Sequence, residues 1–78
     1  MTYRHPRNDH LRDERVRRGL TQAALGEKAG IDPIYVSMLE RGVRGNPGIR
    51  IAYALSDALG VSVYDIFPRP KTHDTLNG

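Results

Sequence analysis

The chain has 78 residues and no cysteine, and its 12 basic residues against 9 acidic ones give a formal net charge of +3. This length has room for one small domain, and without cysteines neither disulfides nor a cysteine-ligated zinc ion can stabilise it, so apolar packing must do so. No apolar stretch is long enough to span a bilayer and residues 1–10 lack a signal-peptide pattern, so we expect a cytoplasmic protein. Ten basic residues are arginines, which suits a polyanionic partner but is equally typical of a solvated surface.

Residues 1–8 are mainly polar and contain a proline, and they predict a flexible arm before the first helix. This helix is expected over residues 9–18, because an acidic residue opens it and Gly19 follows its last turn. Leu11 and Val16 are its main apolar residues, so we expect both side chains to contribute to the core.

Two short helices joined by a tight turn are predicted between residues 21 and 41. Thr21 is a typical N-cap of the first one, because its hydroxyl accepts from the free backbone N–H groups of the first turn. Gly30 ends this helix, since glycine adopts the left-handed conformation of a helix terminus without strain. Asp32 followed by Pro33 starts the second helix, because the carboxylate caps it and the fixed φ of proline suits the first helical position.

The rest of the chain predicts a loop, two more helices and a tail. Glycine-rich residues 43–48 predict the loop, and apolar residues at helical spacing predict a fourth helix over residues 49–59. A serine and an aspartate three residues apart resemble a capping box, which starts a short fifth helix through Phe67. Residues 68–78 show no periodicity and predict a flexible tail. We therefore expect an all-α, compact bundle of about five short helices, with its folded domain over residues 9–67.

The two central helices carry a specific pattern that ends in Ser-x-x-Glu-Arg-Gly. Its members are Gln22, Ala24, Leu25, Ala29, Gly30, Ile31, Val36, Ser37, Leu39, Glu40, Arg41 and Gly42. This pattern resembles the helix-turn-helix of the Cro/C1-type (Xre-like) family of transcription regulators, and the likeness extends from Leu11 to Phe67. It implies a lambda-repressor-like domain that binds double-stranded DNA and takes no cofactor. The runs 32–37 and 40–47 are similar to the small restriction-modification controller proteins.

In such regulators the second helix of the motif enters the major groove, where each base pair shows a distinct pattern of donors and acceptors. The resemblance places Pro33, Ile34, Ser37 and Met38 near the bases. Ile34 and Met38 suit thymine methyl groups, and Ser37 is the hydrogen-bonding group, so DNA shape carries the remaining discrimination. The alternative for Ile34 and Met38 is packing against a protein neighbour.

Four further residues are candidates for contact with the DNA backbone. Gln22 lies at the open start of its helix, where a phosphate oxygen can meet its amide and free N–H groups; the alternative is a hydrogen bond inside the motif. Tyr35 and Arg41 resemble backbone-contacting positions. Arg44 resembles a basic position that contacts a phosphate or a guanine edge, and we favour Arg44 over Arg41 as a contact.

The resemblance also implies a structural ion pair between Glu40 and Arg15. It further implies a homodimer, because members of the family commonly pair through the C-terminal region, and a two-fold dimer requires a near-palindromic operator. Val63, Tyr64 and Ile66 are the candidate interface residues. Some of this apolar segment must instead close the core, and we expect Ile66 and Phe67 to do so, which leaves Tyr64 as the more exposed candidate.

The sequence thus predicts a sequence-specific DNA-binding transcription regulator, and likeness to controller proteins adds autoregulation. An alternative is an antitoxin that binds DNA as part of a complex, although residues 69–78 are short and poorly apolar for binding a partner. Catalysis is not expected, because His5, His10 and His73 share no metal-ligand spacing and no nucleophile lies in a catalytic motif. We expect no metal, no small-molecule ligand and no membrane contact.

Overall fold

The computed structural model describes residues 7–45 and 47–68, and this part of the chain forms five helices. They are α1 (Asp9–Arg17), α2 (Gln22–Ala29), α3 (Pro33–Arg41), α4 (Ile49–Leu59) and α5 (Val63–Ile66). The all-α fold is confirmed, and each predicted helix end lies within one residue of the observed one. Apart from Arg7, Asn8 and Pro68, the predicted arm and tail lie outside the described residues. Every helix of the described part is too short or too polar to cross a membrane.

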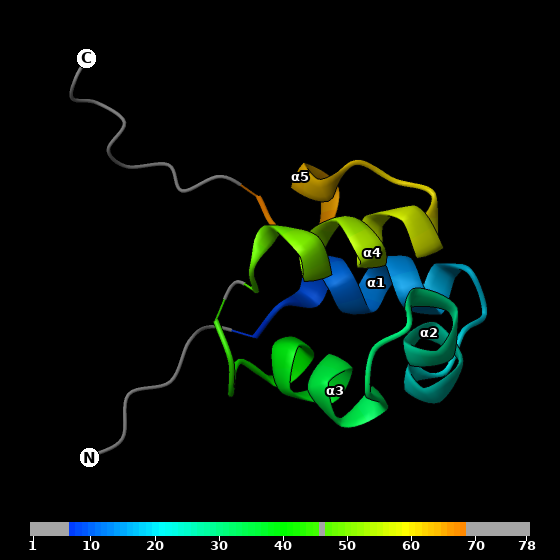
Figure 1. Ribbon diagram of the computed structural model, residues 1–78, viewed down its shortest axis with the longest axis horizontal. Helices are drawn as coiled ribbons and strands as arrows, with labels where there is room; N and C mark the ends of the chain where they lie inside the picture. The colour runs from blue at the N-terminus through cyan, green and yellow to red at the C-terminus, as the bar shows by residue number, and fades with distance from the viewer. Residues whose placement is uncertain (1–6, 46, 69–78) are drawn as a thin grey trace, which may run out of the picture.

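The helices surround a single core. In Figure 1, α1 lies between α3 on one side and α4 with α5 on the other. Helix α1 packs against α3 and α5, while α2 packs against α3 and α4. Each of the five helices contributes at least one buried apolar residue, and Phe67 follows directly after α5. The buried residues of the core are Leu11, Leu25, Val36, Leu39, Ala52, Leu55, Leu59, Ile66 and Phe67. The apolar packing that the composition requires is therefore drawn from the whole folded segment.

Val16 does not contribute to this core as the sequence analysis expects. Val16 is 52% exposed, whereas Leu11 on the same helix is fully buried. Five helical residues separate the two by about 140° around the helix axis, so they cannot both face inward. Arg15 lies four residues after Leu11 and occupies the inward face instead, because its guanidinium has buried polar partners.

The start signals of the two central helices act as predicted. The Thr21 hydroxyl accepts from the Ala24 N–H at 2.9 Å, and the Asp32 carboxylate accepts from the Ile34 N–H at 2.9 Å. Between the two helices Gly30 has φ 74°, in the left-handed region that favours glycine. These contacts satisfy N–H groups that a helix start leaves without an intrahelical partner, and they define the angle at which α3 begins.

Asn8 belongs to the folded domain, although the sequence analysis assigns it to the arm. Its Oδ1 accepts from the Leu11 N–H at 2.9 Å and so caps α1. Its Nδ2 donates to the Ile66 carbonyl at 2.8 Å, and its backbone N–H donates to the Glu40 carbonyl at 2.9 Å. One residue therefore joins the start of α1 to the ends of α3 and α5. No local pattern indicates this role, because one partner lies 58 residues away.

Candidate nucleic-acid interface

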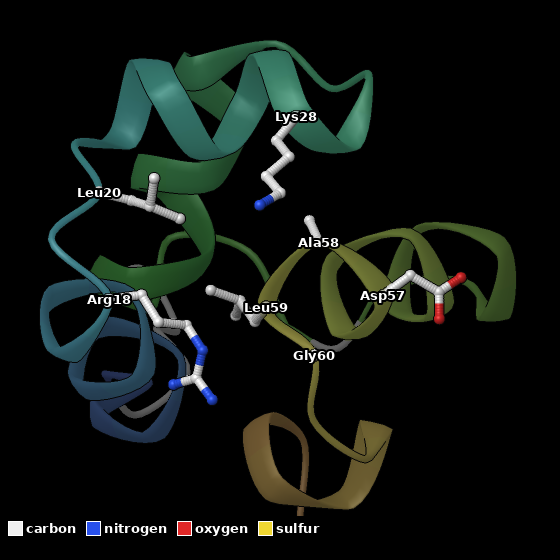
Figure 2. Close-up of a pocket in the computed structure, with 7 residues that line it drawn as sticks. All are labelled: Arg18, Leu20, Lys28, Asp57, Ala58, Leu59 and Gly60. Atoms are coloured by element: carbon white, nitrogen blue, oxygen red, sulfur yellow. The ribbon is translucent and has the colours of Figure 1, made fainter.

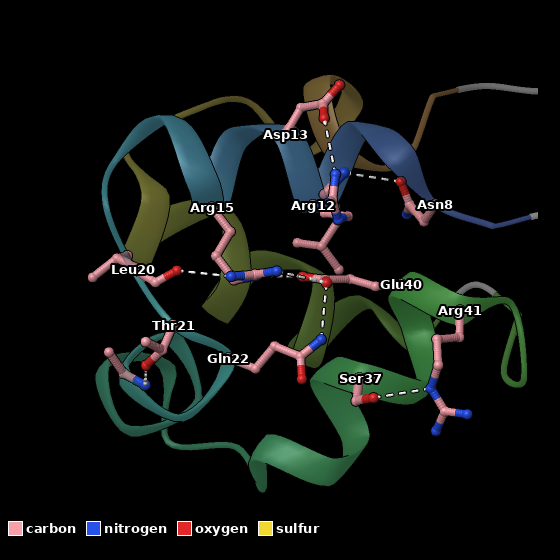
Figure 3. Close-up of polar contacts among 12 residues, drawn as sticks. Asn8, Arg12, Asp13, Arg15, Leu20, Thr21, Gln22, Ser37, Glu40 and Arg41 are labelled. Carbon is pink, nitrogen blue, oxygen red and sulfur yellow. Dashed lines mark hydrogen bonds and ion pairs between the residues drawn. The ribbon is translucent and has the colours of Figure 1, made fainter.

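A buried polar network sets the position of α3 relative to α1 and α2 (Figure 3). Arg15 Nε donates to Glu40 Oε2 at 2.7 Å, and Arg15 Nη2 donates to Glu40 Oε1 at 3.1 Å. The third guanidinium nitrogen, Nη1, donates to the Leu20 carbonyl at 2.8 Å. The side chain of Arg15 is only 12% exposed and that of Glu40 only 3%. The structure thus contains the ion pair that the family resemblance implies, and the pair connects α1, the turn after it and α3.

Gln22 completes the same network. Its Nε2 donates to Glu40 Oε1 at 3.0 Å, which is the internal hydrogen bond that the sequence analysis names as the alternative to a phosphate contact. The residue is half-buried at the first position of α2. An amide nitrogen carries two N–H groups, so one remains for an acceptor outside the domain. Glu40 accepts three hydrogen bonds, which is the condition for keeping a carboxylate buried.

Next to this network the surface forms a hollow of about 320 Å³, here called the arginine hollow. It is lined by Arg7, Arg12, Arg15, Gln22, Glu40 and Arg41. Four arginines and one glutamate line it, so the hollow has an excess of positive charge. The carboxylates nearest Arg7 and Arg12 lie at 3.8 and 4.0 Å in exposed pairs, where water and salt screen the interaction. The arginine hollow is therefore suited to a polyanion.

The sequence analysis did not single out Arg7 or Arg12 as functional residues. Composition leaves them in a run of arginines that is equally typical of a solvated surface, and only the fold brings them beside Arg41 of α3. One signal was available, because Arg12 and Arg15 lie three residues apart and so on one face of a helix. Arg17, by contrast, pairs on the surface with Glu14 at 3.3 Å.

A second pocket, of about 420 Å³, lies between the C-terminal ends of α1, α2 and α4 (Figure 2). It is lined by Arg18, Leu20, Lys28, Asp57, Ala58, Leu59 and Gly60. Two cationic residues and one acidic residue line it, and Arg18 is already paired with Glu14. It therefore has a smaller positive excess than the arginine hollow and is less suited to a polyanion.

Helix α3 presents the residues that the resemblance assigns to the bases. Val36 is fully buried, whereas Ile34 is 62% exposed and Pro33 is exposed. Ser37 and Met38 are half-buried at the middle of the helix. A long apolar side chain such as Ile34 with more than half of its surface in water is available for contact with another molecule.

Two interactions hold the polar side chains on and after α3. Arg41 Nε donates to the Ser37 Oγ at 3.0 Å, one helical turn earlier (Figure 3). The guanidinium carbon of Arg44 lies 5.8 Å from the centre of the Tyr35 ring, within the range of a cation–π contact. Ser37 is therefore engaged within the protein, and Arg44 is held beside α3 although it follows the helix.

The candidate interface residues of α5 separate into two groups. Tyr64 is 53% exposed and Val63 is half-buried, so both have accessible surface. Ile66 is fully buried, so the structure confirms the core role that the sequence analysis expects for it and removes it from the interface candidates. The reason is packing: α5 lies against α1 and α4, and Ile66 is on the face that closes the core between them.

Known proteins share this arrangement. Residues 11–66 match the model of a family described as helix-turn-helix. The HTH-type transcriptional regulator SinR of Bacillus subtilis is 32% identical over 65 residues, which are 83% of this chain. The chain spans only 57% of the length of that curated relative.

Solved structures support the same likeness. The restriction-modification controller protein C.AhdI from Aeromonas hydrophila is similar at a TM-score of 0.72 and 33% identity, covering 77% of this chain and 89% of that one. The biofilm regulator SinR in complex with DNA is similar at a TM-score of 0.70 and 33% identity, covering 73% of this chain and 90% of that one.

Proposed function

The chain belongs to the Cro/C1-type (Xre-like) helix-turn-helix family of DNA-binding transcription regulators, and we propose that it acts as a homodimer on a near-palindromic operator. This family binds DNA and is not a family of enzymes. The observation that carries the proposal is the arginine hollow beside the exposed face of α3, since it places positive charge next to the helix that reads DNA.

The contacts follow from this arrangement. Helix α3 enters the major groove with Pro33, Ile34 and Met38 toward the base edges. The arginine hollow then borders a phosphate strand, and the remaining N–H of Gln22 meets a phosphate oxygen. Arg44, stacked on Tyr35, extends the positive surface past the end of α3. The apolar contacts supply sequence preference, and the arginines supply affinity that depends on salt.

The regulated gene is proposed to be the protein's own. The similarity to a restriction-modification controller protein supports this proposal. The resemblance to controller proteins implies targets in the protein's own promoter and in that of a neighbouring restriction endonuclease gene. Control then depends on protein concentration and on promoter geometry. The test is therefore binding to the DNA immediately upstream of the gene.

In a gel shift with this upstream DNA, we expect wild type to bind tightly in excess competitor DNA and Arg44→Ala and Gln22→Ala to bind more weakly. Loss of the Arg44 charge is expected to lower the slope of log affinity against log salt by about 1, because one phosphate contact is lost. Arg17→Ala is the matched control, since Arg17 is an exposed arginine outside the hollow. Wild-type binding no tighter than to random DNA would contradict autoregulation, and binding only with a co-purifying small protein would favour the antitoxin alternative.

The homodimer is tested by Tyr64→Glu. In a two-fold interface the same patch is used by both subunits, so the change places a carboxylate twice in an apolar contact surface and should convert a dimer into a monomer in sedimentation velocity. DNA affinity should fall with it, because each half-site is then bound separately. Val16→Glu, at a comparably exposed position of α1, should leave the dimer intact. A wild-type protein that binds its operator as a monomer would refute the proposal.

A further inference from the structure

The exposed face of α3 has few hydrogen-bonding groups with which to distinguish base pairs. Pro33, Ile34 and Met38 have no side-chain donor, and they occupy three of the four positions that the family resemblance assigns to the bases. Contacts to thymine methyl groups are compatible with such a face, but a guanine edge presents only acceptors, N7 and O6, in the major groove. If the protein recognises a guanine in its operator, a side chain other than these three must therefore supply the hydrogen-bond donors.

Ser37, the fourth of these positions, is already used within the protein. Its Oγ accepts from Arg41 Nε at 3.0 Å, so the hydroxyl acts on Arg41 instead of being a freely rotating group at the surface (Figure 3). Helical side chains lean toward the N-terminus of their helix, and this hydrogen bond holds the guanidinium over the turn before its own Cα. The Arg41 head group is thus drawn from the last turn of α3 toward the middle of its exposed face.

Building on the proposed function, we propose that Arg41 is the guanine-reading side chain of α3 and that Ser37 is its positioning residue. With Nε bound to Ser37, the two terminal amino groups of Arg41 point outward as a two-donor fork. This fork matches the N7 and O6 acceptors of guanine, which is the commonest specific contact between an arginine and DNA. Each operator half-site then contains one guanine that is required because of Arg41.

A phosphate is the competing ligand, because Arg41 also lines the arginine hollow. The position of Arg41 favours the base. Arg7 and Arg12 line the hollow from the side of α1 and supply charge for the DNA backbone without any hydroxyl to orient them along α3. Arg41 alone among them is held one turn back along the helix, beside the residues that face the base edges.

The experiment is selection of binding sites from a random duplex oligonucleotide pool with wild type, Arg41→Lys and Ser37→Ala. Wild type should enrich one motif with a guanine at a fixed position of each half-site, preferred by roughly 5- to 150-fold over other bases. Arg41→Lys keeps the charge but loses the planar fork, so it should weaken this preference and retain the rest of the motif, and Arg41→Ala should abolish the preference. Ser37→Ala should reduce the preference at this one position, and Ser37→Thr, which keeps the hydroxyl, should restore it.

A second measurement identifies the contacted atom. Replacing the selected guanine by 7-deazaguanine removes the N7 acceptor, so it should weaken binding of wild type and leave the affinity of Arg41→Ala unchanged. Arg17→Lys is the matched control and should select the wild-type motif.

The possible failures are distinguishable. If Arg41→Lys still selects the guanine and Arg41→Ala weakens all sequences equally with a smaller salt slope, Arg41 contacts a phosphate and the inference is overturned while the proposed function stands. If wild type selects no motif at all, sequence-specific regulation is overturned, and this inference with it.

Discussion

Glu40→Ala is expected to lower the free energy of unfolding by about 3 to 5 kcal/mol, because it leaves the guanidinium of Arg15 without its charge partner in a largely buried site. The Glu40 side chain is 3% exposed and accepts from both Arg15 and Gln22. In a domain of this size such a loss lowers the melting temperature by roughly 10 °C or more. Thermal unfolding followed by circular dichroism at a fixed protein concentration measures it.

Two further variants separate charge from shape at this site. Glu40→Gln preserves the volume and removes the charge, so it should also destabilise strongly. Asp13→Ala is the surface control: its pair with Arg12 has a separation of 4.0 Å and both side chains are more than half exposed, so the change should be below about 1 kcal/mol. The double variant Arg15→Ala with Glu40→Ala should lose less free energy of unfolding than the two single variants lose together, since no charge is then left unpaired. Strict additivity would show that the two side chains do not interact.

Leu11→Ala is expected to cost about 2 to 5 kcal/mol, because the side chain is fully buried and its truncation leaves a cavity among α1, α3 and α5. This is a large part of the stability that so small a domain attains without disulfides. Urea unfolding gives this loss of stability from the shift of the unfolding midpoint, provided that the dependence of the free energy of unfolding on urea concentration stays unchanged.

Val16→Ala is the matched control on the same helix. The sequence analysis expects both residues in the core because both are apolar, whereas the structure leaves Val16 52% exposed, so its truncation should change stability by less than about 0.5 kcal/mol. Equal costs for the two variants would contradict the burial that distinguishes them. If Leu11→Ala also lowered the free energy of unfolding only slightly, neighbouring side chains would have to fill the cavity that the truncation leaves.

Local signals in the sequence were sufficient to predict the helices. Thr21, Asp32 and Ser62 each form the capping contacts predicted for them, because a cap depends on residues two or three positions away. The turn at Gly30 is likewise predictable, since its left-handed conformation is a property of one residue. The family pattern, which includes Glu40, added the identity of the fold and the partner of Arg15.

The sequence by itself therefore determined where each helix begins and ends, and which family of DNA-binding domains the chain belongs to. The tertiary structure alone decided which distant residues act together: it tied Asn8 to the Ile66 carbonyl and brought Arg7 and Arg12 beside Arg41. The physical reason is the range of the interactions. Caps and turns depend on a few neighbouring residues, whereas burial and the grouping of charges depend on how distant helices pack, and no local pattern contains that information.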